Sequence, residues 1–147
     1  MRYRVLLLLF LGLLPTSLTW ASPVQQVFSD WLVTCNNQNF CVTRNVGLHH
    51  GLVMTLSRSA GAHMDAALRI ELGLVNPVAA VPPIAPRLLL DDKPLQRGEE
   101  HWKVQPKLLA TEDSATIDAF LQQVQDAQAI TLQKGVQVIS LKGLKAA

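Results

Sequence analysis

The sequence predicts a mainly β fold: an antiparallel β-sandwich-like single domain with one packed α-helix at about residues 114–127. Three observations support this prediction. Apolar and polar residues alternate with a period of two over many short segments, as in strands that bury one face. Glycine, proline, asparagine and aspartate separate these segments at short intervals, which is typical of turns. A single segment has the apolar spacing of an amphipathic helix.

The N-terminal segment has the pattern of a secretory signal peptide. Arg2 and Arg4 precede an apolar run over residues 5–14, and small or polar residues follow up to Ala21. Because this order is that of a targeting segment, we expect cleavage after Ala21. A membrane anchor would need about 20 continuous apolar residues. We therefore expect residues 1–21 to be removed, and the protein to reside in the periplasm without stable insertion in a membrane.

The remaining residues 22–147 are expected to form one exported domain. A chain of about 126 residues can bury one hydrophobic core but not two. The whole chain has 13 basic and 11 acidic residues. Because Arg2 and Arg4 leave with the signal peptide, the domain keeps 11 of each kind and has no net charge. This balance gives no electrostatic reason to expect a nucleic acid partner.

The first expected unit of the domain is a disulfide-linked hairpin. One strand is expected over residues 31–35 and a second over 41–46, with an asparagine-rich turn between them. Trp31 would share a face with Cys35 and lie in the core. The chain has two cysteines, Cys35 and Cys41, and an exported protein meets an oxidising compartment, so we expect a disulfide between them. A redox-active pair is the alternative, although the two-residue spacing of that class is missing.

Further strands are expected along the chain. They cover about 52–56, 68–72, 87–90, 101–104, 129–133 and 136–141, with a hairpin turn at Lys134 and Gly135. Met54 is expected to pack in the core. Residues 22–27 are expected to form a short lead-in. Asp91 and Asp92 are expected in a turn, because neighbouring residues on a strand point to opposite faces and would not form a catalytic or metal-binding pair.

The helix is expected to begin near Asp113 or Ser114, since either side chain can cap a helix N-terminus. Its apolar residues have the spacing i, i+3, i+4 and i+7. They are Ile117, Phe120, Leu121 and Val124. The polar face carries glutamines and acids without the Lys or Arg of a membrane-surface helix. The pattern therefore indicates a helix that packs on the domain.

A proline-rich apolar segment at residues 77–86 is the first candidate for partner binding. Its four prolines exclude the interior of a helix or of a sheet, so we expect an extended crossing. We favour a packed connection, because ten bare apolar residues would reduce solubility. An exposed segment would instead be a partner site. The candidate partner contacts are Val81, Pro82, Pro83, Ile84 and Trp102.

Three histidines suggest a second class of function. His49, His50 and His63 lie near Met54 and Met64 in the sequence, and imidazole with thioether ligands could hold copper in an exported protein. Adjacent histidines without further ligands at fixed spacing do not define a metal site. The sequence also lacks phosphate-binding glycine loops and the sharp turns that expose a nucleophile. We therefore expect no cofactor and no catalytic residue.

Several segments together resemble a known family. They are Phe28-x-x-Trp31-x-Val33-x-Cys35 with Cys41, the apolar run that ends in Asp91-Asp92, the helix at 117–124, and Val138-Ile139-Ser140-Leu141-Lys142-Gly143-Leu144. In these the chain resembles the invasion-associated locus B proteins of bacteria and a related uncharacterised periplasmic family. The resemblance implies a small exported β-rich domain without established catalytic residues. We expect a non-enzymatic envelope protein that binds another protein or a surface component, with copper handling as the alternative.

Overall fold

The structure is a computed structural model that describes residues 23–47, 51–59, 65–73, 82–98, 101–133 and 138–147. Several features singled out in the sequence lie outside these residues. They are the expected signal peptide at 1–21, His49, His50, His63, Met64, Val81 and the turn at 134–135.

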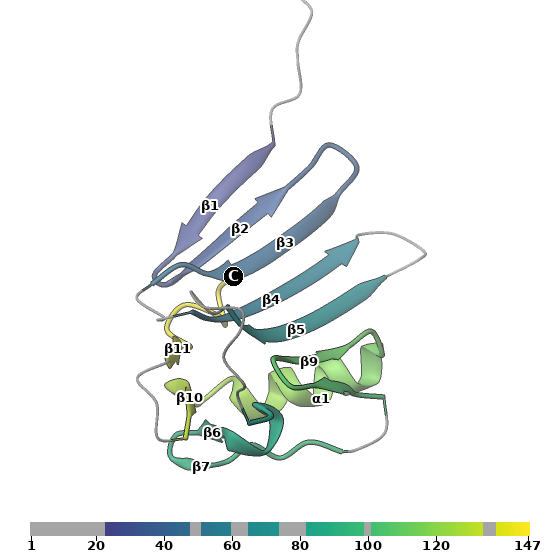
Figure 1. The fold of residues 1–147 in the computed structure, drawn as a ribbon. Coiled ribbons are helices and arrows are strands. Elements are labelled where there is room, and N and C mark those ends of the chain that lie inside the picture. The colour runs from purple at the N-terminus through teal and green to yellow at the C-terminus, as the bar shows by residue number, and fades with distance from the viewer. Residues whose placement is uncertain (1–22, 48–50, 60–64, 74–81, 99–100, 134–137) are drawn as a thin grey trace, which may run out of the picture.

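Two antiparallel sheets form the fold (Figure 1). The larger sheet contains, in spatial order, β1 (Val24–Phe28), β2 (Trp31–Cys35), β3 (Phe40–Asn45), β4 (Leu52–Ser59), β5 (Ala66–Leu72), β9 (Leu108–Thr111) and β8 (Lys103–Gln105). The smaller sheet contains β11 (Val138–Ser140), β10 (Ala129–Leu132), β6 (Leu88–Leu90) and β7 (Lys93–Pro94). The prediction of a mainly β, sandwich-like domain is confirmed.

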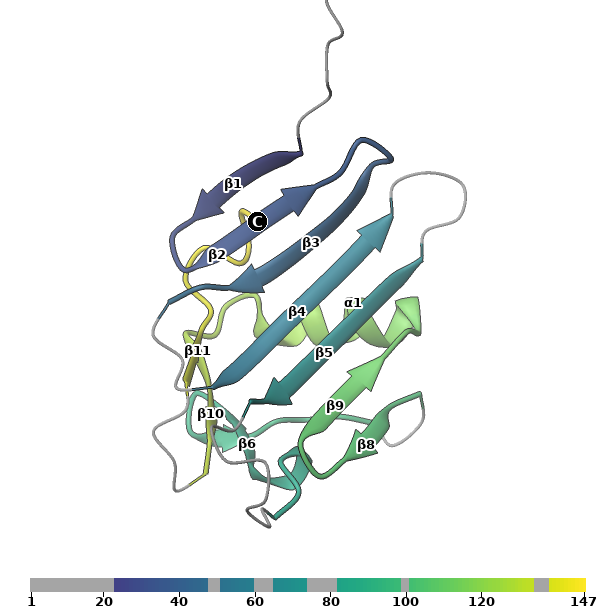
Figure 2. The same ribbon diagram turned by 45° about the horizontal axis from the view of Figure 1, so that its top comes forward.

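One α-helix, α1 (Ser114–Val124), is present among the described residues, and it covers one face of the larger sheet. Figure 2 shows it behind β4 and β5. Helix α1 contacts β5, and strand β11 of the smaller sheet contacts β4. The core lies between these layers. Its largest fully buried side chains are Trp31, Leu52, Met54, Leu68, Ile70, Ile84, Leu88, Leu109, Ile117, Val124, Ile130 and Ile139.

The central strands β4 and β5 follow the predicted alternation. Met54 lies opposite Ile70, and both side chains are fully buried, whereas Arg69 between two buried neighbours of β5 is exposed. The period of two therefore places one apolar row on the inner face, towards α1. Met54 packs in the core, as expected.

The disulfide of the first hairpin is present, with an S–S distance of 2.03 Å between Cys35 and Cys41. The side-chain oxygen of Asn36 accepts hydrogen bonds from the backbone N–H groups of Gln38 and Phe40, at 2.9 and 3.0 Å. Asn39 has a positive φ of 59°, a conformation that asparagine adopts more readily than most residues. The asparagine-rich sequence thus forms the tight turn that the sequence predicts.

Two strands of the larger sheet lie where no strand was expected. Strand β1 occupies the segment that was expected to be a short lead-in. Its Val24 and Val27 are mostly exposed, so its apolar and polar residues do not alternate between a buried and an exposed face. Strand β9 has the sequence Leu-Leu-Ala-Thr, in which apolar residues fall on both faces. A two-sided apolar run of this length does not show the period of a strand.

The proline-rich segment departs from the prediction at its end. Residues 85–87 form a 3₁₀ helix, although a helix was considered excluded here. Pro86 occupies the first turn, where the missing N–H group of proline removes no hydrogen bond. Because Arg87 belongs to this turn, strand β6 begins at Leu88, one residue later than expected.

Helix α1 also ends earlier than predicted. Its last residue is Val124, three residues before the expected end at Ala127. The backbone N–H of Ala127 donates to the carbonyl oxygen of Val124 at 3.1 Å. This i+3 bond closes a tighter final turn and redirects the chain into β10.

The beginning and the end of the described chain meet. The indole N–H of Trp31 donates to the carbonyl oxygen of Ser140 at 2.9 Å, and the hydroxyl of Ser140 donates to the carboxylate of Asp30 at 2.6 Å. The backbone N–H of Asp30 also donates to the carbonyl oxygen of Lys142 at 3.3 Å. These contacts join the turn before β2 and the start of β2 to the last strand across about 110 residues of sequence.

Candidate functional site

The candidate site is a cleft along α1. Its volume is about 430 Å³, and one wall is the helix while the other is the segment that leads into β8. The side chains that give the cleft its chemical character are Arg97, His101, Trp102, Asp113, Thr116 and Phe120. The cleft therefore combines aromatic rings with groups of both charges.

An aromatic pair forms the apolar part of the cleft. The rings of Trp102 and Phe120 pack edge to face, with centroids 6.0 Å apart and an interplanar angle of 68°. Phe120 is buried in the core, whereas Trp102 is half-buried. Trp102 directly precedes β8, an edge strand of the larger sheet among the described residues. The core thus holds one face of the indole and leaves the rest at the cleft.

Gln123 holds the second wall of the cleft in place. With its amide nitrogen facing the carbonyl oxygen of Gln96, the side chain donates to that oxygen at 2.9 Å and accepts from the backbone N–H of Gln96 at 3.1 Å. A side-chain amide that pairs in this way replaces the missing strand partner of an extended backbone. The bond fixes Gln96 and the neighbouring Arg97 against the helix.

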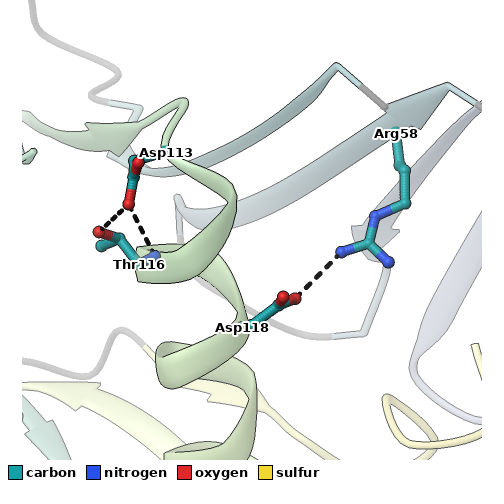
Figure 3. Close-up of polar contacts among 4 residues, drawn as sticks. All are labelled: Arg58, Asp113, Thr116 and Asp118. Carbon is teal, nitrogen blue, oxygen red and sulfur yellow. Dashed lines mark hydrogen bonds and ion pairs between the residues drawn. The ribbon is translucent and has the colours of Figure 1, made fainter. Parts of the chain in front are cut away.

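Asp113 caps the helix at the edge of the cleft (Figure 3). Its carboxylate accepts hydrogen bonds from the hydroxyl of Thr116 at 2.6 Å and from the backbone N–H of Thr116 at 2.9 Å. The hydroxyl bond, the backbone bond and, to a smaller degree, the nearby His101 lower the pKa of Asp113 from its ordinary value of 3.8, while burial acts in the opposite direction. Asp113 is therefore an ionised structural cap, and the prediction that Asp113 or Ser114 would cap the helix is confirmed for Asp113.

A surface ion pair also anchors α1 to the sheet. The guanidinium of Arg58 lies 3.4 Å from the carboxylate of Asp118, as Figure 3 shows. The two side chains are 44% and 64% exposed, so the pair contributes less than about 1 kcal/mol. It orients the helix but is not part of the cleft.

The predicted partner contacts differ in their exposure and do not lie together. Trp102 lines the cleft, whereas Ile84 is fully buried and its backbone N–H donates to the carbonyl oxygen of Pro106 at 3.1 Å. Ile84 therefore presents no side-chain surface to a partner. Pro82 and Pro83 are exposed, and their carbonyl oxygens accept hydrogen bonds from the side chain of Arg87. Neither proline lines the cleft.

The acidic pair Asp91 and Asp92 lies in a turn, as predicted, and both residues have positive φ angles of 47° and 65°. The carboxylate of Asp91 reaches further than expected. It accepts hydrogen bonds from the backbone N–H groups of Gln128 and Ala129, at 3.0 and 3.1 Å, and so ties the turn to the start of β10. This role occupies the carboxylate that a catalytic or metal-binding interpretation would need.

Metal binding has no support in the described part of the chain. No group of three histidine, cysteine, aspartate or glutamate side chains within it is arranged to hold a metal ion. His49, His50 and His63 lie outside that part, so copper handling stays a prediction. The two cysteines are joined in the disulfide, away from the cleft.

Sequence reasoning named Trp102 as a partner contact and assigned Asp113 and Phe120 to the helix, but it did not bring these residues together. Arg97 and His101 come from the segment before β8 and Gln123 from α1, and no motif links them in the sequence. His101, just before Trp102, has a positive φ of 67°, which no residue pattern in its neighbourhood predicts.

The described helices include none with the length and apolarity needed to cross a membrane.

Comparison with known proteins gives one family and one relative. The model of a family described as "Protein of unknown function (DUF1176)" matches residues 25–147. The "Uncharacterized protein YpfG" of Escherichia coli (strain K12) is 65% identical over 148 aligned positions, which cover 100% of this chain and 43% of that protein. The chain thus spans less than half the length of this relative. No solved structure matches the chain.

Proposed function

The chain belongs to the family of proteins of unknown function DUF1176, and from the chemistry of its cleft we propose that it is a non-enzymatic binding protein of the bacterial envelope. The proposed partner is another protein, and the proposed contact surface is the cleft around Trp102. The same proposal includes export to the periplasm through the N-terminal segment.

The observation that carries the proposal is the half-buried Trp102 on the buried Phe120. A tryptophan held by the core on one side and open to a cleft on the other is preorganised for contact, because little side-chain entropy remains to be lost on binding. Tryptophan and arginine are enriched among the residues that contribute most to protein interfaces. Arg97 lies in the same cleft, so both kinds of anchor are available together.

The neighbouring strand favours an extended protein segment as the partner. Strand β8 is an edge strand within the described part of the chain, and its Val104 is 45% exposed. A segment that adds to this edge would place its side chains next to Trp102. The main chain would then supply affinity, and the cleft would select the side chain that enters it.

The resemblance to the invasion-associated locus B proteins forms the finer part of the proposal. It is supported by the contact between two of its four motifs, in which Trp31 donates to the carbonyl oxygen of Ser140. The disulfide is compatible with export but does not establish it.

The proposal is tested by capture of partners with matched variants. The disulfide-bonded chain would be used as bait in an envelope extract, and bound proteins would be quantified for the wild type, Trp102→Ala and Arg97→Glu. We expect both variants to lose the main bound protein by about tenfold or more, because each removes an anchor of the cleft. Phe40→Ala is the control, since Phe40 is an exposed aromatic residue at the disulfide-linked hairpin.

Trp102→Ala also removes a packing partner of Phe120 and could lower stability. Arg97→Glu changes the cleft without removing that contact, so it separates a loss of binding from a loss of folding. Circular dichroism and thermal unfolding would show that each variant is folded. If both folded variants retain every partner at the level of the wild type, the cleft is not the binding surface.

A further inference from the structure

The outer edge of β1 is a second surface, and it does not depend on the proposed function of the cleft. Strand β1 is the first strand of the larger sheet and pairs only with β2 among the described strands (Figure 1). All five of its residues are paired with β2 without a bulge. Edge strands of soluble proteins are usually protected by a charge, a proline or a bulge, yet β1 has the sequence Val-Gln-Gln-Val-Phe.

The register determines which backbone groups of β1 face outwards. Two hydrogen bonds join the two ends of the 30–36 segment to the β3 side: the N–H of Asn36 donates to the carbonyl oxygen of Phe40, and the N–H of Val46 donates to the carbonyl oxygen of Asp30. Because backbone groups alternate in direction along a strand, the even-numbered residues of this segment bond to β3. The odd-numbered residues of β2 therefore bond to β1, where they lie opposite Val24, Gln26 and Phe28. The N–H and C=O groups of Gln25 and Val27 consequently point away from the sheet. Val27 is 61% exposed, in agreement with an open edge.

These outward groups fit a second copy of the same strand. In an antiparallel pair with a two-fold axis at Gln26, Gln25 lies opposite Val27 of the second copy, and about four main-chain hydrogen bonds form. A shift by two residues in one direction places Val27 opposite Pro23, which has no N–H. A shift in the other direction places Gln25 opposite Ser29, a turn residue with a φ of 53°. The register centred on Gln26 is the one in which all outward groups meet extended, hydrogen-bonding residues.

The side chains agree with this register. A two-fold axis places only the residue on the axis directly opposite its own copy, so a charged residue there would repel itself. The residue at the axis is the neutral Gln26, whose amide can donate and accept. Val24 lies opposite Phe28 of the second copy, on the same face of the strand as Gln26, so the pairing would cover the exposed Val24 side chain. We therefore propose that two copies of this protein associate through β1 and form one sheet that runs through both molecules.

The test introduces a positive or a negative charge at Gln26, the residue on the axis. The mass of the purified, disulfide-bonded chain would be measured by light scattering over a concentration series for the wild type, Gln26→Lys, Gln26→Glu and an equimolar mixture of these two variants. We expect a dimer of the wild type, an increase of its dissociation constant by at least about tenfold in each variant alone, and recovery of the dimer in the mixture. Gln122→Lys is the matched control, because it makes the same change at an exposed position of α1.

Two results would overturn the proposal. The first is a wild-type protein that stays monomeric at every concentration. The second is a dimer that Gln26→Lys and Gln26→Glu leave unchanged, which would place the interface elsewhere. Because neither variant alters the cleft, partner capture through Trp102 would be unaffected, and the two proposals can fail separately.

Discussion

At the scale of single residues, Gly143 joins the two ends of the described chain. Its φ is 92°, a conformation that favours glycine, and a Cβ atom at this position would overlap the carbonyl oxygen of Phe28. The close approach lets Ser140 and Lys142 reach Asp30. A residue without a side chain is therefore required where the turn after β11 passes the end of β1.

Replacement of Gly143 should be costly. Gly143→Ala is expected to lower the free energy of unfolding by about 1–3 kcal/mol, because an alanine is strained in the left-handed backbone and its Cβ atom would displace Phe28 and Ser29. Denaturant unfolding measures this loss. Gly98→Ala is the control, since a Cβ at residue 98 meets no atom within 4 Å, and it should change stability by less than about 0.5 kcal/mol. Equal effects of the two substitutions would contradict the packing of Gly143.

The cap at Asp113 predicts a pH dependence of stability. The folded protein lowers the pKa of Asp113 through the bonds from Thr116, so folding favours the ionised carboxylate. The stabilisation is fully present above the ordinary value of 3.8 and is lost as the pH falls through the lowered pKa. Asp113→Asn keeps a capping oxygen but does not titrate there. The stability difference between wild type and variant should shrink as the pH falls from about 6 to about 2.5. A difference independent of pH in thermal unfolding would contradict this role.

At the scale of elements, the sequence predicted those whose apolar residues recur with a regular period and missed β1 and β9, whose sequences lack one. Strand β5 and helix α1 were found because their buried residues recur with a fixed period. Strand β1 exposes most of its side chains, and the pairing of β9 with β5 depends on residues about 40 positions apart. A local sequence pattern predicts neither the exposure of β1 nor the pairing of β9. Both strands form because of their contacts with the rest of the fold.

The hairpin of β2 and β3 allows a prediction about the disulfide. The bond between Cys35 and Cys41 closes a short loop, so its removal should lower the free energy of unfolding by about 2 kcal/mol in the chain-entropy model. The double variant Cys35→Ser with Cys41→Ser would be compared with the wild type by denaturant unfolding. Hydrogen exchange should increase mainly at the end of β2 and the start of β3. A variant that does not fold at all would show that the disulfide is more than a local restraint.

At the scale of the whole molecule, the site depends on distant segments that the sequence does not connect. The sequence predicts Trp102 as a partner contact, but the cleft exists because Gln123 of α1 holds Gln96 and because Phe120 supports the indole. The sequence also predicts Ile84 as a contact, because it belongs to the proline-rich apolar segment, but Ile84 is buried and its backbone bonds to Pro106. Composition identifies apolar candidates, whereas only the fold decides which of them reach the surface.

The contact between the chain's two ends gives a prediction for the whole fold. Ser140→Ala removes the hydroxyl that donates to Asp30 at 2.6 Å, and the loss of a hydrogen bond to a charged group should cost about 1.5–3 kcal/mol. The effect should spread to the other end of the chain. The N–H of Asp30 bonds to Lys142 and the N–H of Val46 bonds to Asp30, so both amides should exchange faster with deuterium.

Amides in the centre of β5 are the baseline in the same variant, because they exchange through global unfolding and should accelerate only as far as the global loss of stability requires. Ser57→Ala is the matched control, since Ser57 is a half-buried serine of β4 in the same sheet. If Ser140→Ala accelerates exchange only within β10 and β11, the last strand packs on the first hairpin without stabilising it. If it accelerates exchange at Asp30 and Val46 as well, the segments around Trp31 and Ser140 form one structural unit, in which the last strand stabilises strands β1 to β3.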